Sequence, residues 1–445
     1  MGTRIAPCFE GLVSVLPVVW QENAGETLLR IQVVVAMQQL VTALGRDSVQ
    51  AYGFLLPLLQ YAADPQGPEA AAMFEDALML WGAALRHAPD GREEVLAFFP
   101  YLVTHGLAST EHLPLVMQIL QSHVYLGGAP LLRAHAQPLA ALLAHVSGRS
   151  SSPGNRPRPD LAPASVLTSN RAWGNQVVDS VNERGIAATA PALELMLQTD
   201  AGLTATILEV CLQKLFAKLV DPEGDHLAQV AILNVFNRLC VQDRACLVAL
   251  LAKWAEGGGA AGGQPPQQRP SPPQPDPLEA YVQALLRLSS GIASLSKQKL
   301  AALALCSMLE SRQAAVLRHL AAVLQEIHRI WSHGEKRLHD ALGGDYGPQA
   351  DDVHDYGYVD YEVIDCTGAG SGGADPCETG RCTRVWQQDR VNRFSIKASA
   401  AGVVAALLAA AEPVPSALRA LPQPVQAAVQ EMLQGAAGPS AAVAT

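Results

Sequence analysis

Charged and aromatic side chains are scarce in this sequence. Charged residues make up 16% and aromatic residues 5% of the 445 residues, whereas hydrophobic residues reach 49%. A balance dominated by Ala and Leu favours packed helices over strands, because both residues are strong helix formers. The formal net charge is -10, whereas a protein that binds nucleic acid is expected to present a basic surface. Direct binding of DNA or RNA is therefore disfavoured.

The usual sequence signatures of catalysis are also missing. The chain contains no G-x-S-x-G nucleophile turn, no P-loop, no H-E-x-x-H helix and no dinucleotide-binding glycine pattern. A serine or cysteine nucleophile would further need a base and an orienting group within reach, and no such pattern stands out. The sequence therefore predicts that the protein is not an enzyme, with no catalytic residue and no cofactor.

Paired cysteines of the kind that hold zinc are absent. Cys366, Cys377 and Cys382 follow His354, but their spacing is C-x10-C-x4-C rather than the C-x2-C of a structural zinc site. We therefore expect no metal site. An enzyme or zinc site in this cysteine-bearing region remains an alternative, although a disfavoured one.

Targeting and membrane-spanning segments are not evident. Pro7 and Glu10 interrupt the apolar N-terminal stretch, and the Ala/Val/Leu run from Ala398 is too short to cross a bilayer. The eight cysteines are scattered singly, which is typical of a reducing compartment. We expect an intracellular protein without a membrane span.

What the sequence does contain is a succession of helical patterns. Apolar residues recur at spacings of three and four, as in Leu29, Val33, Met37 and Leu40, and Gly45 closes that run. Helix pairs follow one another roughly every 40 residues, a length typical of HEAT and armadillo units. Because a single pair cannot bury its own apolar faces, such units stack. The predicted fold is all-α, a HEAT/armadillo-like superhelical solenoid with disordered inserts.

The stretch from Ser294 to Leu309, "SLSKQKLAALALCSML", has almost no polar side. We expect Ser296 to cap its start and neighbouring helices to cover most of its circumference, as they would for an inner helix of a solenoid. The same apolarity would also suit a buried helix in an ordinary bundle. Large aromatic side chains are expected in the core: Trp81, Trp173 and Trp331.

The predicted organisation alternates helical repeats with linkers. The helical parts are expected at residues 1–146, 164–255 and 278–337, with C-terminal helices at 384–437. A disordered linker is expected at 147–163, a Gly/Pro-rich linker at 256–277 and an acidic Gly-rich loop at 338–383. The string "PSPPQP" in the second linker could bind an SH3 domain, but an unselective insert is the favoured interpretation.

The acidic loop is the one candidate binding region. Between Leu338 and Gly380 there are ten Asp or Glu residues and no Lys or Arg. Such a segment could attract a basic partner over long range, although a solvated insert without selectivity is the favoured interpretation. The candidate partner-binding residues are Asp351, Asp352, Asp355, Asp360, Glu362 and Asp365.

Several strings resemble, in the same order, the C-terminal half of nuclear transport receptors of the importin-beta (karyopherin) family. They are "LLRIQVVVAMQQLVTALG", "YGFLLPLLQYAADP", "FEDALMLWGAALRHAP" with its acidic-Ala-Leu-x-Leu-Trp core from Glu75 to Trp81, "AILNVFNRLCVQDRACLVALLA", "SLSKQKLAALALCSML" and "LRALPQPVQAAVQEMLQG". Together they cover most of the chain outside the linkers.

This resemblance implies a HEAT solenoid that carries protein cargo through the nuclear pore under the control of Ran in its GTP form. The implied partners are cargo, Ran and nuclear pore proteins, and the implied location is the nucleus, the cytoplasm and the nuclear envelope. The repeats on which the family binds Ran precede the matched portion and are absent from this chain, so no residue here is assigned to Ran, and both a fragment and a short form stay open. The family also carries an acidic loop near this place. The alternative is a helical-repeat scaffold for a cytoplasmic complex unrelated to transport.

Overall fold

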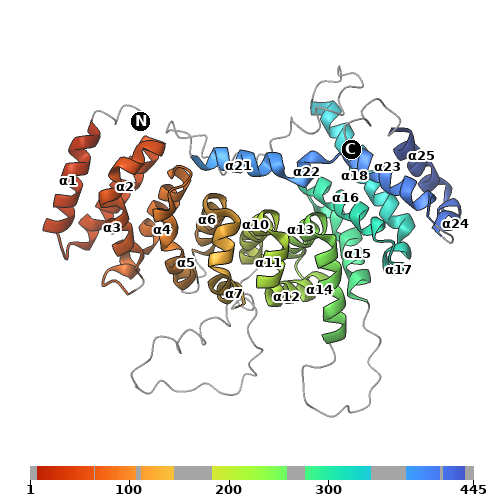
Figure 1. Ribbon diagram of the computed structural model, residues 1–445, viewed down its shortest axis with the longest axis horizontal. Helices are drawn as coiled ribbons and strands as arrows, with labels where there is room; N and C mark the ends of the chain where they lie inside the picture. Colours follow the sequence, from red (N-terminus) through yellow and green to blue (C-terminus); the bar gives the residue numbers. More distant parts are fainter. Residues whose placement is uncertain are drawn as a thin grey trace, which may run out of the picture. The chain divides into compact units, whose positions relative to one another are not determined.

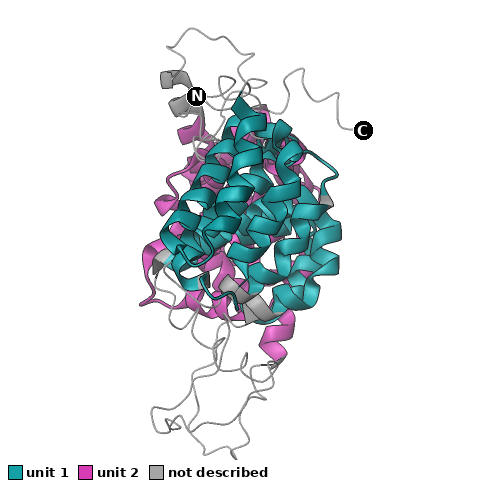
Figure 2. Cartoon of the chain, turned by 90° about the vertical axis from the view of Figure 1, so that its left-hand side faces the viewer, with its two compact units in different colours: residues 1–212, 361–385 teal, residues 213–360, 386–445 magenta. Residues whose placement is uncertain are grey.

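The computed structural model describes residues 8–64, 66–106, 112–144, 183–257, 276–341, 377–410 and 414–435. All regular secondary structure in these residues is helical (Figure 1). The chain divides into two compact units, Met1–Leu212 with Tyr361–Val385, and Gln213–Asp360 with Trp386–Thr445 (Figure 2). Two of the three boundaries fall inside helices, α12 (Glu209–Val220) and α21 (Cys377–Gln388), and the third, between Asp360 and Tyr361, falls inside the predicted acidic loop.

Unit 1 is a two-layer stack of helices. A first row is formed by α2, α4, α6 and α10, each in contact with the next, while α3 packs on α4, α5 packs on α6, and α7 contacts α5 and α11 (Figure 1). Its elements are α1 (Phe9–Glu22), α2 (Thr27–Leu44), the 3-10 helix η3 (Gly45–Ala51), α3 (Tyr52–Ala63), α4 (Ala70–His87), η4 (Glu93–Phe98), α5 (Phe99–Gly106), α6 (Leu113–Ala134), α7 (Ala136–Ala144), α10 (Glu183–Thr199) and α11 (Ala201–Ile207).

Unit 2 is built around α16 (Leu295–Glu310). This helix packs against α13, α18 and α23, so the apolar stretch singled out in the sequence is an inner helix, as predicted. Ser294, and not Ser296, occupies the N-cap position. The other elements are α13 (His226–Gln242), α14 (Arg244–Gly257), α15 (Pro277–Leu288), η6 (Ser289–Gly291), α17 (Ala314–Leu317), α18 (Leu320–Ala341), α22 (Arg390–Arg393), α23 (Ile396–Leu408), α24 (Val414–Arg419) and α25 (Gln423–Gly435).

Aspartate side chains define where several helices begin. The carboxylates of Asp200, Asp225 and Asp276 accept hydrogen bonds from backbone N–H groups in the first turns of α11, α13 and α15. The first N–H groups of a helix have no partner within the helix, so an N-cap carboxylate satisfies one of them and meets the positive end of the helix dipole. The polar residues between apolar runs thus fix the register of the helices.

The segment Thr27–Ala63 is long and apolar enough to span a membrane. The mean hydropathy is 1.4, and 39% of its apolar 18-residue stretch is buried. In the structure it is not one straight helix but α2, η3 and α3, with Gly45 at a φ of 59° between them. Val34, Met37 and Leu55 are fully buried in unit 1. A core helix satisfies the same criterion of length and hydropathy, and the packing of these side chains is that of a core.

The all-α repeat prediction is confirmed by these two-layer stacks. Trp81 and Trp331 are buried, as predicted, while Trp173 lies outside the described residues. The linker 147–163 and most of the linker 256–277 also lie outside the described residues. The second of these linkers joins α14, which ends at Gly257, to α15, which begins at Pro277.

The bounds of the predicted loop 338–383 need correction. Helix α18 continues to Ala341, and α21 begins at Cys377, six residues before the predicted end of the loop. Residues 342–376 lie outside the described residues. The helix was missed because its first turns, "CETGRC", contain Gly380 and too few apolar residues to produce a helical periodicity.

We predict that the stack is stabilised chiefly by buried leucines, and α13 offers a matched test. Leu233 is fully buried, whereas Leu227 on the same helix is 59% exposed. Leu233→Ala should lower the free energy of unfolding by about 2–5 kcal/mol, since it removes buried methyl groups and leaves a cavity. Leu227→Ala should change it by no more than about 0.5 kcal/mol. Urea unfolding followed by helical circular dichroism measures both, and equal effects would contradict this account of the core.

Candidate functional site

The acidic residues predicted to bind a partner, Asp351 to Asp365, lie outside the described residues. The structure instead draws attention to the segment that follows them. Residues 377–393, comprising α21, Asp389 and α22, lie against the ends and sides of other helices and are called the strap below. Its residues 377–385 belong to unit 1 and its residues 386–393 to unit 2.

In unit 1 the strap is anchored by Arg381 at the C-terminus of α4. The guanidinium donates hydrogen bonds to the carbonyl oxygens of Leu85 at 2.8 Å and Ala88 at 2.7 Å, and its side chain is 3% exposed. The last carbonyl groups of a helix have no partner within the helix and carry the negative end of the dipole. A planar guanidinium reaches two of them at once and neutralises that end. We call these carbonyl groups the α4 cradle.

Further contacts fix the orientation of α21 in unit 1. Asp90, just past the end of α4, lies 3.4 Å from Arg381 and 2.7 Å from Arg384. At the other end of this part of the strap, the Gln198 side chain of α10 donates a hydrogen bond to the carbonyl of Val385 at 3.2 Å. The strap thus touches both α4 and α10 of the first row.

Buried ionisable groups surround the cradle. Burial raises the pKa of Glu378, only partly offset by a hydrogen bond with Ser122 and by the positive charges of Arg381 and Arg86. Burial, helped by the same two arginines, lowers the pKa of His87 to about 4. His87 is therefore neutral at physiological pH, and the environment favours the neutral form of Glu378.

In unit 2 the strap is held by an ion pair between Asp389 and Arg238 of α13. One nitrogen of the guanidinium lies 2.7 Å from each carboxylate oxygen, and both side chains are buried. The same carboxylate accepts the backbone N–H of Val391 at 3.0 Å and so caps the start of α22. Val391 packs with Leu300 and Leu303 of α16.

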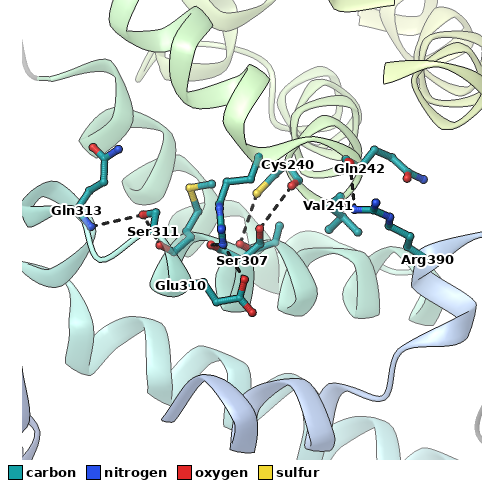
Figure 3. Close-up of polar contacts among 11 residues, drawn as sticks. Cys240, Val241, Gln242, Ser307, Glu310, Ser311, Gln313 and Arg390 are labelled. Atoms are coloured by element: carbon teal, nitrogen blue, oxygen red, sulfur yellow. Dashed lines mark hydrogen bonds and ion pairs between the residues drawn. The ribbon is translucent and has the colours of Figure 1, made fainter. Parts of the chain in front are cut away.

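Arg390 repeats in unit 2 what Arg381 does in unit 1. It donates to the carbonyl oxygens of Val241 at 3.1 Å and Gln242 at 3.0 Å, at the C-terminus of α13 (Figure 3). Two arginines of one segment thus satisfy the carbonyl ends of two helices, α4 and α13.

The buried thiols nearby are packing groups. Cys240 donates to the carbonyl oxygen of Ala304 over 3.6 Å, and Ser307 of α16 donates to the carbonyl of Cys240 at 3.5 Å (Figure 3). Burial raises the pKa of both Cys240 and Cys306 to about 12. Because the thiolate is the reactive form, these thiols are inert at neutral pH.

The cysteine-bearing region gives no support to a zinc site where it can be seen. Among the described residues no three His, Cys, Asp or Glu side chains are grouped so that they could hold a metal ion. Cys377 and Cys382 lie on α21 and are not joined in a disulfide, while His354 and Cys366 lie outside the described residues.

Sequence reasoning missed the residues that anchor the strap: Glu378, Arg381, Asp389 and Arg390. A signal was present, because the acidic stretch without any cation ends at Gly380 and is followed by Arg381, Arg384, Arg390, Arg393 and Lys397. An abrupt change in charge of this kind indicates a segment with a distinct role. It does not say which helices the segment contacts.

A family model described as "Importin-11-like, TPR repeats" matches residues 31–157 and 161–412 of the chain. The chain is 22% identical to importin-11 of Homo sapiens over 316 residues, 71% of this chain and 28% of that protein. It is 30% identical to importin-11 of Mus musculus over 139 residues, 31% of this chain and 14% of that protein. It therefore spans less than a third of the length of these relatives.

Among solved structures, the fold is similar to that of Lph2, described as a novel bidirectional nuclear transport receptor in S. cerevisiae. The TM-score is 0.69 at 15% sequence identity, and the match covers 95% of this chain and 40% of that chain. This likeness concerns the fold.

We predict that Glu378→Gln is at least as stable as the wild type at pH 7, because the pKa of Glu378 is raised by burial. The stabilisation that Glu378 provides is fully present below its unfolded pKa and is lost as the pH rises through the folded pKa. The advantage of the Gln variant should therefore shrink as the pH falls from about 7 to about 5. Urea unfolding at several pH values measures this difference.

The matched control is Glu75→Gln, an exposed glutamate on α4 of the same unit. This variant gives the change in stability that comes from removing an exposed carboxylate. A Glu378→Gln variant that is clearly less stable than the wild type at pH 7 would show that the carboxylate is charged and favourably paired.

Proposed function

Because the chain belongs to the importin-11-like family with TPR repeats, whose model matches residues 31–157 and 161–412, we propose that it is the cargo-binding C-terminal portion of a nuclear transport receptor. The family match is the observation that carries this proposal. The two-layer helical stacks and the fold of Lph2 support it. The chain would act by binding and carrying protein cargo, without a catalytic step.

The packing indicates how such a portion would hold cargo. Apolar side chains of inner helices such as α16 are buried against neighbouring helices. What remains for a partner is the ends of helices, their loops, the charged faces and a few exposed apolar side chains, such as Val15 and Val18 of α1. Affinity in the proposed receptor is therefore spread over many modest contacts along the stack rather than placed in one deep pocket.

Control by Ran in its GTP form belongs to the same proposal. The family resemblance assigns Ran binding to repeats that precede the matched portion, so we assign no residue of this chain to Ran. Contact with nuclear pore proteins and a location in the nucleus, the cytoplasm and the nuclear envelope follow from the proposed transport. Import of protein cargo into the nucleus is the direction we propose.

We also propose that the acidic segment provides electrostatic preference for basic cargo. Nine carboxylates besides the buried Glu378 lie between Leu338 and Gly380 without a Lys or Arg, and they would produce a strong negative field. Such a field attracts Lys/Arg-rich segments over about 10 Å at ordinary salt and weakens as salt is added. The residues concerned are Asp351, Asp352, Asp355, Asp360, Glu362 and Asp365.

We predict that the full-length product of the gene that encodes this chain binds Ran loaded with GTP more tightly than Ran loaded with GDP. The reason is that Ran control depends on the GTP form in the family. Binding is measured by pull-down with purified Ran in each state, and a fluorescent fusion should concentrate at the nuclear rim. Failure of both experiments would leave only a helical-repeat scaffold unrelated to transport.

We predict that neutralising the six acidic candidates as Asn or Gln weakens binding of a labelled Lys/Arg-rich peptide by about tenfold at low salt, because the attraction is electrostatic. Fluorescence anisotropy at several salt concentrations measures the affinity. The neutralised variant should also lose most of the salt dependence.

The control changes the same number of charges elsewhere. Six exposed glutamates are replaced by Gln in the control variant: Glu10, Glu22, Glu26, Glu75, Glu223 and Glu256. This variant should bind the peptide nearly as the wild type does. Equal losses in the two variants would mean that net charge, and not the acidic segment, attracts the peptide.

A further inference from the structure

The core of unit 1 encloses a histidine that is completely buried. His123 of α6 has an exposed fraction of 0%, and its ring lies between Trp81 of α4 and Phe99 of α5. The ring centroids are 5.6 Å apart for Trp81 and 5.2 Å apart for Phe99, and both rings stand nearly perpendicular to the imidazole, at 88° and 85°. Because α6 packs on both α4 and α5, His123 lies where three helices meet.

Neither nitrogen of the His123 ring is satisfied. In the described part of the chain, Nδ1 and Nε2 have no hydrogen-bond partner. A buried polar atom without a partner costs free energy, which an apolar ring of similar size would not cost in the same place. What the histidine brings instead is a side chain that can change its charge near neutral pH.

The surroundings of His123 disfavour a positive charge on it. Burial, helped by the charge of His135 just past α6, lowers the pKa of His123 from 6.5 to about 3. The faces of Trp81 and Phe99 attract a cation, but this offsets only part of the cost of removing a charge from water. The other buried or half-buried acidic and basic side chains described on the elements packed against α6 are Asp76, Arg86, His87, Glu194, Glu378 and Arg381. None of them forms a hydrogen bond with the His123 ring.

The histidines of unit 2 have different surroundings. Those whose burial the structure describes are exposed or half-buried: His226, His319, His328 and His333. Nε2 of His319 lies 3.2 Å from a carboxylate oxygen of Glu279, and Nε2 of His328 lies 2.8 Å from one of Glu431. A positive charge on these rings would face water or a carboxylate, whereas a positive charge on His123 would face an aromatic core.

We propose that His123 is a proton-operated trigger in unit 1: when its ring takes up a proton, the packing of α6 on α4 and α5 opens, while unit 2 stays folded. The neighbouring residue Ser122 forms a hydrogen bond with Glu378 of α21. Opening of α6 therefore also loosens the part of the strap that belongs to unit 1. The ligand of this device is the proton itself, and the device is independent of the proposed transport function.

The direction of the response follows from proton linkage. The folded pKa of His123 lies below the unfolded value, so unit 1 loses stability as the pH falls below about 6.5. Between about pH 7.5 and about pH 5 this favours the open state about 30-fold, because the ring is charged when open and neutral when closed. His87, with its pKa lowered to about 4, acts in the same direction. Glu378 acts in the opposite direction, because its pKa is raised.

Hydrogen exchange of the full chain, read by mass spectrometry and corrected for the intrinsic pH dependence of exchange, tests the proposal. In the wild type, the amides of α4 and α6 should lose protection between about pH 7.5 and about pH 5, relative to those of α13 and α16. Two replacements remove the titrating ring: His123→Phe, which keeps an aromatic ring, and His123→Leu, which is apolar without a ring. Each should reduce the loss about 30-fold. Glu378 is present in all three chains, so its contribution cancels in the comparison.

The matched control is His112→Phe, the same substitution in the same unit. His112 precedes α6, is half-buried, and lies with its ring 5.2 Å from that of Phe74. This variant should keep the loss of protection that the wild type shows, because it leaves His123 in place.

Three results would overturn the proposal. The first is a wild type in which both units lose protection equally or neither loses any, a measurement that needs no variant. The second is a full loss of protection in His123→Phe or His123→Leu. The third is a His112→Phe chain in which the loss is abolished as it is in the His123 variants. None of these measurements involves cargo, Ran or the acidic segment, so their failure is distinct from failure of the proposed transport function.

Discussion

An apolar helix is stable in water only where neighbouring helices cover most of its circumference, and the rest of this structure depends on that constraint. Helix α16 is covered by α13, α18 and α23, and helix α4 is covered by α2, α3 and α6. Each helix pair therefore needs the next one. The consequence is that most apolar side chains of the inner helices are buried inside the stacks, as those of α16 are.

The carbonyl groups at helix C-termini need hydrogen-bond donors, and arginines supply them at several of the described helices. Besides Arg381 and Arg390 of the strap, Arg244 donates to the carbonyl of Ser307 at 2.7 Å, and Arg287 donates to that of Leu219 at 3.1 Å. A helix end carries roughly half a negative charge and several unsatisfied acceptors, and the planar guanidinium matches both. The scaffold and the strap thus use one chemistry. What distinguishes the strap is that it brings few apolar groups with it.

The difference between these two kinds of contact explains what could be predicted from the sequence. The inner helix at Leu300–Leu309 was predictable because its apolar residues can only be explained by surrounding neighbours, and the structure confirms it. Helix α21 was not predictable, because Glu378 and Arg381 have the composition of an exposed surface. Their burial depends on carbonyl groups of α4, almost three hundred residues away in the chain. Local sequence carries no information on such a pairing, whereas helical periodicity is local.

The proposed attraction by the acidic segment and the contact of Arg381 with the α4 cradle depend on distance in different ways. As proposed, the acidic segment would act over long range and select for positive charge, without defined geometry. The α4 cradle acts only at contact, and it selects for a guanidinium whose two nitrogens reach the carbonyls of Leu85 and Ala88 together. A lysine, with a single ammonium group, cannot reproduce that geometry. In the proposed receptor the first would raise the local concentration of basic segments, whereas the second holds the chain's own Arg381 in place.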